Sequence, residues 1–255
     1  MTHVAAPSRT QQYADSLDEL YAAVRDRDFS FVSGAAMRKC LTLRSEHALS
    51  DWQAFVDSWD GLAVDTYMAD GGRYRRRKYA TLSASAGAST ARLEPHQPHY
   101  QDLEYNRLNG GVARYFEPID PEIVAGSTLT SVIGLGLGVY SRLLPGLGAH
   151  IEVHQFRIEA QADQAGRPTP EGVHRDGVDF VLVMMVRRVN IASGTTEIFD
   201  LERRPLDSFT LTGPLDTALV NDRRAMHGVT PIEPLDPRLP AYRDVLVVTY
   251  RQVST

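Results

Sequence analysis

The order of helical and strand patterns along the chain limits the folds it can adopt. Residues 13–60 carry apolar side chains every three or four positions, as amphipathic helices require, and a second helical stretch is predicted near 121–144. From Ile151 onward the pattern changes to short strands separated by Gly and Pro, with no helix between them. Parallel strands would need crossover helices, so antiparallel pairing is expected. We therefore predict a mainly β protein whose jelly-roll, cupin-like core is covered by flanking helices.

Six strands are expected in the second part of the chain, after one earlier strand. The earlier strand covers about 73–82, and the others are 151–160, 178–190, 195–201, 208–212, 217–220 and 244–253. Neither an internal repeat nor a linker interrupts the sequence, and 255 residues suit one β-barrel with added helices. We expect a single domain, 1–255, with a helical N-terminal segment at about 1–60 and core strands over about 151–253.

Composition indicates which partners the protein can have. A net charge of −5 and a pI near 5.9 give no basic surface for nucleic acid or an anionic membrane, so small molecules are the expected partners. No apolar run is long enough to cross a bilayer, and residues 1–12 lack the apolar centre of a signal peptide. The only cysteine, Cys40, excludes an intrachain disulfide and is expected to be a small buried side chain in a helix. These features favour a cytoplasmic protein.

Three residues in the predicted barrel have the chemistry and spacing of an iron site. His174 and Asp176 are separated by one residue, so in an extended strand both side chains point to the same face. His227 follows a further short strand, so both segments lie at predicted strand edges. Two imidazoles and one carboxylate form the facial triad, which binds Fe(II) and leaves the opposite side open for substrate and O2. Alternatively, both histidines are ordinary residues at the ends of loops, and Asp176 forms a turn with Gly177.

The predicted iron site leads to a prediction about an arginine. Three protein ligands leave three positions on an octahedral ion, enough for a bidentate 2-oxo acid and O2. If that acid is 2-oxoglutarate, its distal carboxylate needs a cation, and the planar guanidinium of arginine binds carboxylate through two hydrogen bonds. Arg243 begins the last strand, and a strand returning beside the one near His227 would point it into the barrel. Arg251 has the same parity and is the second choice, and either residue could instead lie at the surface.

Other polar residues on predicted strands could contact a substrate. Gln155 and Arg157 share one face of their strand, where they either line a pocket or face solvent. Arg73, Arg75 and Arg77 share a face of the earlier strand. For these three a solvated surface is the default, and contact with a substrate carboxylate is the alternative.

Residues 134–138, Gly-Leu-Gly-Leu-Gly, do not fit a dinucleotide-binding loop. The third glycine comes one residue too early, and the strand that should precede the loop is missing. A tight loop or close helix packing is the expected reason for these glycines.

Several of these segments together resemble a known enzyme family. The sequences EGVHRDG, NDRRAMHGVTPI and YRDVLV are similar to Fe(II)/2-oxoglutarate dioxygenases of the group that includes bacterial L-isoleucine dioxygenases, and the similarity extends to 110–119 and 153–157. The resemblance implies a double-stranded β-helix with iron bound by His174, Asp176 and His227. It also implies hydroxylation or a related oxidation of a free L-amino acid, coupled to conversion of 2-oxoglutarate and O2 to succinate and CO2.

The resemblance also bears on substrate recognition. Halogenating relatives replace the carboxylate ligand by a small residue, whereas this chain has Asp176, so hydroxylation is expected. A free amino acid carries two charges that must be paired in a closed pocket. Arg157 or the 73–77 face could bind its carboxylate, and Asp179 or Glu197 could bind its ammonium.

Two other functions are compatible with these residues. A cupin-like protein that binds a metal or small ligand without catalysis would explain the histidines but not Arg243. A zinc hydrolase could use the same three ligands, with Glu171 or Asp179 as general base. The identity of the bound metal and the consumption of 2-oxoglutarate distinguish the three functions.

Overall fold

Helices form the first part of the computed structural model, which describes residues 16–106, 108 and 110–253. They are α1 (Leu17–Arg27), α2 (Gly34–Arg44), α3 (Trp52–Asp57) and the 3-10 helix η1 (Ser58–Gly61), followed later by α4 (Pro121–Ala125) and α5 (Ser127–Leu143). Both predicted helical stretches are confirmed, although strand β1 (Phe29–Val32) separates α1 from α2. Residues 1–12, on which the expected cellular location depends in part, and residues 13–15 of the first stretch lie outside the described residues.

Local sequence explains where the first two helices begin. The hydroxyls of Ser16 and Ser33 accept hydrogen bonds from the backbone N–H groups of Glu19 and Ala36, each at 3.3 Å. These bonds satisfy N–H groups that have no partner within a helix, which is why serine favours this position. In the described part of the chain, no helix has the length and apolar character needed to cross a membrane.

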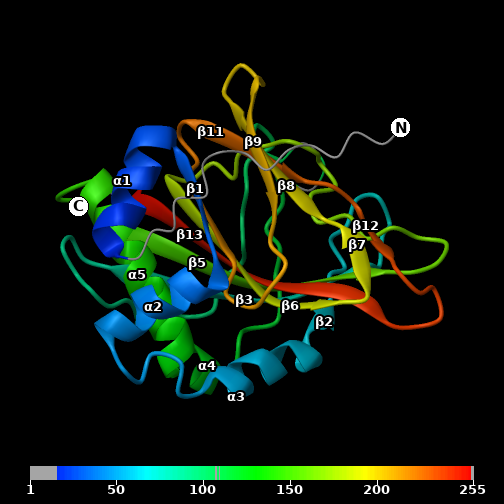
Figure 1. The fold of residues 1–255 in the computed structure, drawn as a ribbon, viewed down its shortest axis with the longest axis horizontal. Helices are drawn as coiled ribbons and strands as arrows, with labels where there is room; N and C mark the ends of the chain where they lie inside the picture. Colours follow the sequence, from blue (N-terminus) through cyan, green and yellow to red (C-terminus); the bar gives the residue numbers. More distant parts are fainter. Residues whose placement is uncertain (1–15, 107, 109, 254–255) are drawn as a thin grey trace.

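The β core consists of a large sheet that faces smaller ones (Figure 1). The large sheet has the order β1-β10-β6-β13-β5-β3-β2, with β4 paired to β3, and the smaller sheets are β11-β8-β9 and β12-β7. The predicted strands are β3 (Arg75–Ala84), β5 (Gly148–Ala160), β6 (Phe180–Val189), β8 (Thr195–Asp200), β9 (Pro205–Thr210), β10 (Thr217–Asn221) and β13 (Ala241–Val253). The additional ones are β1, β2 (Ala63–Val64), β4 (Arg92–Leu93), β7 (Ile191–Ser193), β11 (Ala225–Val229) and β12 (Ile232–Pro234). All strand pairs defined in the described residues are antiparallel, as predicted.

A β-bulge lies between β6 and β13. Asp244 is paired with Arg187, but the next residue of β13, Val245, is paired with Met185. Val186 therefore has no partner on β13. It packs in the cluster on the helix side, whereas Met185 packs with Val245 on the opposite side. A bulge of this kind bends the strand and increases its twist.

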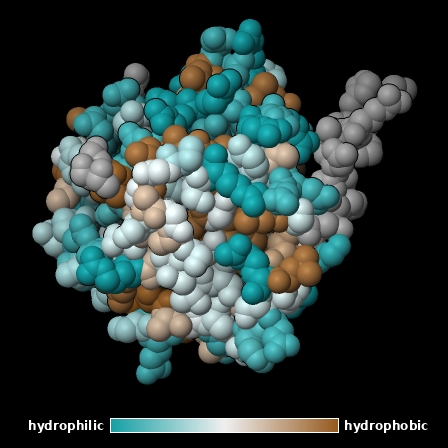
Figure 2. Space-filling view, turned by 90° about the vertical axis from the view of Figure 1, so that its left-hand side faces the viewer, coloured by the Kyte–Doolittle hydropathy of each residue, from teal (hydrophilic) through white to brown (hydrophobic). Residues whose placement is uncertain are grey.

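The helices cover one face of the large sheet (Figure 1), as predicted. One hydrophobic cluster joins helical side chains such as Leu20 and Leu135 to strand residues such as Val153 and Tyr250. Seen from the side of α1, the outer surface is mostly polar to neutral, with small apolar areas (Figure 2). The helices therefore turn their apolar faces to the sheet, where each buried Leu or Val side chain contributes about 1.5–3 kcal/mol.

Close packing explains the glycines of α5. A Cβ atom on Gly136 would lie 2.1 Å from the hydroxyl oxygen of Tyr250, so only glycine lets that ring approach the helix. The Tyr250 hydroxyl donates a 3.0 Å hydrogen bond to the carbonyl of Ile133. The prediction of close helix packing is confirmed, and so is the burial of Cys40, which is 3% exposed.

Candidate active site

A cavity lies between the large sheet and the sheet that contains β11. Alternate residues of two central strands form one wall: Glu152, His154, Phe156 and Ile158 from β5, and Arg243, Val245, Val247 and Thr249 from β13. The loop between β4 and α4 contributes His99, Gln101, Asn106 and Arg114, and the segment before β6 contributes Glu171, His174 and Asp176. His227 of β11 completes the side opposite β13. The cavity therefore collects ionisable side chains from segments far apart in the sequence.

His174, Asp176 and His227 meet in this cavity. The backbone of His174 forms a two-residue bridge with that of His227, each N–H donating to the other carbonyl at 2.9 Å. The Nε2 atoms of His174 and His227 lie 3.5 and 3.7 Å from the carboxylate oxygens of Asp176. All three potential ligand atoms lie within 4.8 Å of one another. This geometry disagrees with the alternative of unrelated loop residues, and it places His227 inside β11 rather than at a strand edge.

Electrostatics in the cluster suit a cation. Burial lowers the pKa of His174, but Asp176 and Glu171 outweigh it and raise that pKa to about 10. Burial and the charge of His174 lower the pKa of His227 to about 4. Burial opposes ionisation of Asp176, yet the two imidazoles hold its pKa well below its usual range. An anionic Asp176 and a neutral His227 are the states that bind metals, and a metal ion would replace the proton on His174.

Asp222 holds the backbone next to Asp176. Its carboxylate accepts hydrogen bonds from the N–H groups of Asp176, Gly177 and Val178 at 2.9, 2.9 and 3.1 Å. Burial and the negative charge of Asp176 raise the pKa of Asp222 to about 7. The sequence predictions missed this residue, although an acidic residue directly after buried strand β10 was a usable signal.

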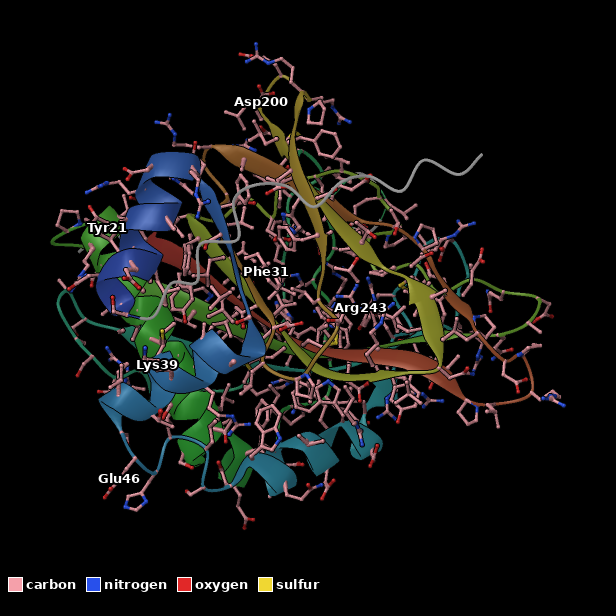
Figure 3. The ribbon with its side chains drawn as sticks, viewed as in Figure 1. Tyr21, Phe31, Lys39, Glu46, Asp200 and Arg243 are labelled. Atoms are coloured by element: carbon pink, nitrogen blue, oxygen red, sulfur yellow. The ribbon has the colours of Figure 1, made fainter. Side chains whose placement is uncertain are left out.

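Arg243 enters the same cavity from the opposite sheet (Figure 3). It is 2% exposed, and its Nε and Nη1 atoms have no hydrogen-bond partner among the described residues. Burial and the charge of Arg188 lower its pKa to about 10, so it remains protonated at neutral pH. The prediction that it returns on a strand beside His227 is wrong, because β13 pairs with β5 and β6. Arg251 is exposed and does not line the cavity.

Arg75 and Arg77 correct the expectation of a solvated strand face. Both are buried and line the cavity, whereas Arg73 is exposed. Arg75 Nη2 lies 2.7 Å from Oδ2 of Asp65, and Arg77 Nη1 lies 3.6 Å from the same oxygen. Asp65 lies just after β2, so its partnership with these arginines required knowledge of the strand pairing. Two of the three arginines therefore belong to the wall of the site.

A second group of potential metal ligands contains His99, Glu152 and His154. Arg77 Nη2 donates a 2.6 Å hydrogen bond to Nδ1 of His154, because a guanidinium cannot accept one. That bond uses the one lone pair of a neutral imidazole. Burial is the largest effect that lowers the pKa of His154 to about 3, so the ring is neutral. We therefore interpret this group as a polar wall, further held by the Tyr79 hydroxyl, which donates to Glu152 at 2.7 Å.

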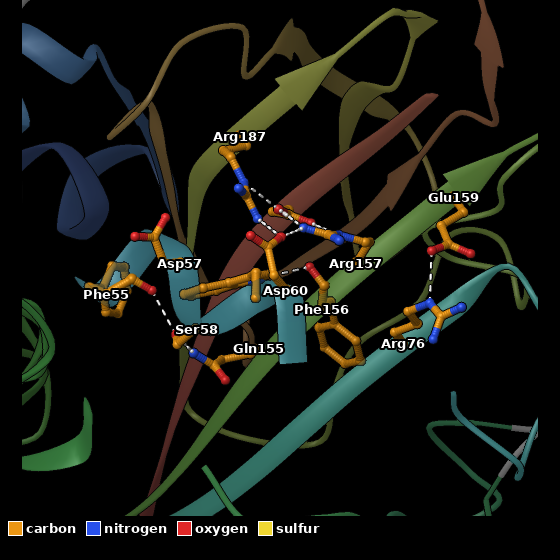
Figure 4. Close-up of polar contacts among 12 residues, drawn as sticks. Phe55, Asp57, Ser58, Asp60, Arg76, Gln155, Phe156, Arg157, Glu159 and Arg187 are labelled. Atoms are coloured by element: carbon orange, nitrogen blue, oxygen red, sulfur yellow. Dashed lines mark hydrogen bonds and ion pairs between the residues drawn. The ribbon is translucent and has the colours of Figure 1, made fainter. Parts of the chain in front are cut away.

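Gln155 and Arg157 do not line the cavity, contrary to one sequence prediction. The side-chain amide of Gln155 donates to the Ser58 hydroxyl at 2.7 Å, and Arg157 lies 2.8 Å from Asp60 and 2.7 Å from Asp244 (Figure 4). Strand alternation turns both side chains toward η1, and the residues between and beside them face the cavity.

The two acids predicted for the substrate ammonium also lie elsewhere. Asp179 accepts a 2.6 Å hydrogen bond from the N–H of Gln252 and lies 3.6 Å from Arg223. Glu197, on β8, is opposite Gly228. Neither residue lines the cavity, so the structure does not support a role for them in binding the ammonium.

The sequence is similar to enzymes of known activity. Residues 56–249 match the family described as 2OG-Fe dioxygenase. A 3(1)-hydroxy-L-isoleucine 4-dioxygenase of Pantoea ananatis (strain AJ13355) is 22% identical over 231 residues, which cover 88% of this chain and 92% of that protein. An L-isoleucine-4-hydroxylase of Bacillus thuringiensis is 25% identical over 207 residues, which cover 80% and 83%.

Solved structures share the fold. A bsmA homologue from Methylobium petroleophilum PM1 superimposes with a TM-score of 0.80 at 34% identity, covering 92% of this chain and 93% of that chain. The structure of IDO from Bacillus thuringiensis gives a TM-score of 0.76 at 18% identity, covering 93% and 100%. These similarities confirm the predicted double-stranded β-helix with helices on one side.

Proposed function

The chain belongs to the 2OG-Fe dioxygenase family, and we propose that it hydroxylates a free L-amino acid while it converts 2-oxoglutarate and O2 to succinate and CO2. The dependence on Fe(II) and 2-oxoglutarate follows from the family. One observation carries the assignment of roles to residues. The cluster of His174, Asp176 and His227 and the unpartnered Arg243 open into one cavity from opposite sheets.

The donor set of the cluster fits Fe(II). Two imidazole nitrogens and one carboxylate are the ligands that non-haem iron oxygenases use, and they leave positions free for cosubstrate and O2. His174, Asp176 and His227 would hold the metal, which supplies the redox chemistry that couples decarboxylation of the 2-oxo acid to oxidation of the substrate. Two sets of hydrogen bonds keep the ligands in place before a metal binds. One is the backbone bridge between the two histidines, and the other joins the Asp222 carboxylate to the N–H groups of residues 176–178.

Arg243 fits the distal carboxylate of 2-oxoglutarate. Its Nε and Nη1 groups are buried donors without acceptors among the described residues, and a carboxylate supplies two acceptor oxygens. Val245 and Val247 follow on the cavity side of β13 and would pack along the methylene groups of the cosubstrate. They also keep water away from the guanidinium, which strengthens its attraction to an anion.

An amino acid is the substrate that the relatives favour. The two related enzymes carry names that specify isoleucine or its hydroxylated form, although each shares only 22–25% of its sequence with this chain. The carboxylate of Asp176 in the cluster supports hydroxylation over halogenation, because it takes the position that a halide would need. The family also disfavours a zinc hydrolase and a binding protein without catalysis.

Mass spectrometry tests this proposal directly. The enzyme is incubated with pooled L-amino acids, Fe(II), ascorbate and 2-oxoglutarate under ¹⁸O2, and products and succinate are measured. We expect one amino acid to gain one labelled oxygen atom in proportion to succinate, and no product from the His227→Ala variant, whose circular dichroism should match wild type. Succinate formation with every pooled amino acid unchanged would contradict the amino-acid substrate. Normal turnover by His227→Ala would contradict the metal site.

A further inference from the structure

We infer that Arg114 binds the carboxylate of the substrate and that Glu171 binds its ammonium, so that the cavity recognises an α-amino acid by its two charges. This inference rests on the proposed function, because it concerns the substrate of the same site. Neither residue belongs to the metal cluster or to the expected 2-oxoglutarate contact.

Arg114 is a buried cation whose Nε and Nη2 atoms have no partner among the residues that the structure describes. Its backbone pairs with that of His99, whose N–H donates to the Arg114 carbonyl at 3.0 Å while the Arg114 N–H donates back at 2.9 Å. This pairing fixes the guanidinium on the cavity wall, where the residue is only 2% exposed. Within the described residues, its Nε and Nη2 atoms have no hydrogen-bond partner, and no carboxylate lies within ion-pair distance. A guanidinium held in this way is suited to an anionic ligand.

Glu171 is the acidic counterpart on the same cavity. Its Oε2 atom is buried and has no hydrogen-bond partner among the described residues, and its Oε1 atom lies 3.4 Å from Nε2 of His174. Burial lowers the pKa of Arg114, whereas the negative charges of Asp65 and Glu171 act in the opposite direction. Glu171 and Arg114 therefore attract each other electrostatically, and no ion pair between them is present in the structure.

The other charges of the cavity wall already have partners inside the protein. Asp65 binds Arg75 and lies near Arg77, and Glu152 accepts the hydrogen bond of Tyr79. Only one cation besides the proposed 2-oxoglutarate contact then lacks a partner among the described wall residues. A zwitterion would satisfy the unpartnered donors of Arg114 and the unpartnered Oε2 atom of Glu171 at once, and a buried polar group without a partner is costly. The carboxylate and ammonium of an α-amino acid have the required signs and lie on one carbon atom.

The roles of Arg114 and Glu171 are tested by measuring how wild type and variants bind an amino acid and two derivatives that each lack one of its charges. Wild-type enzyme is held under anaerobic conditions with Fe(II) and 2-oxoglutarate, so that no turnover occurs, and dialysed against the twenty common L-amino acids. Mass spectrometry identifies those that are retained. The retained amino acid, its primary amide and its N-acetyl derivative are then compared by calorimetry. We expect wild type to bind each derivative on the order of 30-fold or more weakly than the amino acid.

Two variants separate the two charges. Arg114→Gln should lose the preference for the amino acid over its amide but keep the preference over the N-acetyl derivative, and Glu171→Gln should do the reverse. Arg114→Lys should recover part of the preference for a carboxylate, and Arg73→Gln, at an exposed position, serves as the control with no change. A residue with only a structural role would weaken all three ligands alike, so the pattern of preferences identifies direct contact.

The possible failures are distinguishable. If both variants keep the wild-type preferences while wild type forms a labelled hydroxy-amino acid, the inference is wrong and the proposed function stands. Retention of no amino acid by wild type overturns the inference, and it also overturns the proposed function when no hydroxylated amino acid forms. Uniform loss of binding in Arg114→Gln and Arg114→Lys, with an unchanged circular dichroism spectrum, would assign Arg114 a structural role and overturn its assignment.

Discussion

Replacing Arg243 by Met should make the protein more stable without 2-oxoglutarate and unresponsive to it. Arg243 is a buried cation with a second arginine, Arg188, nearby, and two of its donors have no partner in the described part of the chain. Each unsatisfied buried donor costs about 1–3 kcal/mol, and replacing buried ionic groups by apolar ones of similar volume often stabilises a protein by about 1–4 kcal/mol. Methionine has a similar length and bends easily to fill the space. We expect the free energy of unfolding to rise by about 1–3 kcal/mol.

The same substitution should remove the stabilisation by the cosubstrate. At a concentration one hundred times its dissociation constant, 2-oxoglutarate should stabilise wild type by about 2.7 kcal/mol. The Arg243→Met variant should gain almost nothing at that concentration, because the distal carboxylate would enter an apolar site without a cation. If both results are obtained, Arg243 lowers the stability of the free enzyme and raises its affinity for 2-oxoglutarate.

Urea unfolding followed by circular dichroism measures both effects. The two proteins are compared with and without 2-oxoglutarate, in the presence of Zn(II) so that no turnover occurs. Arg251→Met, an exposed position on the same strand, is the matched control and should show neither effect. If Arg243→Met is less stable than wild type without 2-oxoglutarate, the guanidinium has a structural role that contradicts this reasoning. If 2-oxoglutarate still stabilises the variant, its carboxylate binds elsewhere.

Four further substitutions test individual contacts. Asp222→Asn should weaken metal binding about 10–100-fold in a metal titration, because an amide cannot accept all three backbone hydrogen bonds; unchanged affinity would exclude the positioning role. Asp244→Ala leaves the partly buried Arg157 and Arg187 with only the exposed carboxylate of Asp60 and should lower the free energy of unfolding by about 1–3 kcal/mol in urea, so an unchanged value contradicts a stabilising role of Asp244. Gly136→Ala should lower the melting temperature because its Cβ meets Tyr250, and an equal or higher value argues against the close contact. Burial opposes ionisation of Asp65, but two arginines outweigh it and lower its pKa; since the folded value lies below the unfolded one of about 3.9, this stability is present above about pH 4 and lost below it. Asp65→Asn should therefore flatten the acid side of the pH–stability curve, and an unchanged curve would show that Asp65 does not contribute.

The grouping of His174, Asp176 and His227 and the presence of Arg243 in the same cavity could be predicted because short sequence segments carry these residue types. His174 and Asp176 are close in sequence, and a histidine and an arginine further along follow the order expected for this iron chemistry. The strand around His227 was missed because β11 contains Gly228 and few β-branched residues, so its pattern is weak. Its backbone pairing with His174 is a tertiary contact that a local pattern does not contain.

The polar residues that face the cavity from β5 could not be predicted, because both faces of this strand are covered. Gln155 and Arg157 face η1, while His154 and Phe156 face the cavity, and polar side chains occur on both sides. Alternation therefore showed correctly that Gln155 and Arg157 share a face of the strand, but it did not show which face lines the cavity. Arg114 lies in the loop between β4 and α4, where no periodic pattern indicates which side chains turn inward.

The bulge in β6 bears on how different parts of the cavity wall can change. Beyond Val186 the strand bends, and the chain soon continues into β7, which pairs with β12 outside the large sheet. Next to this corner, a Cβ on Gly194 would lie 3.2 Å from Arg188 and 3.6 Å from Arg243. The surroundings of Arg243 are therefore formed by sheet backbone, whereas Arg114 lies in the long connection between β4 and α4. Insertions and substitutions in that connection can alter which substrate side chain fits the cavity without disturbing the turn from β6 into β7. Substrate selectivity can therefore diverge while the use of 2-oxoglutarate is retained.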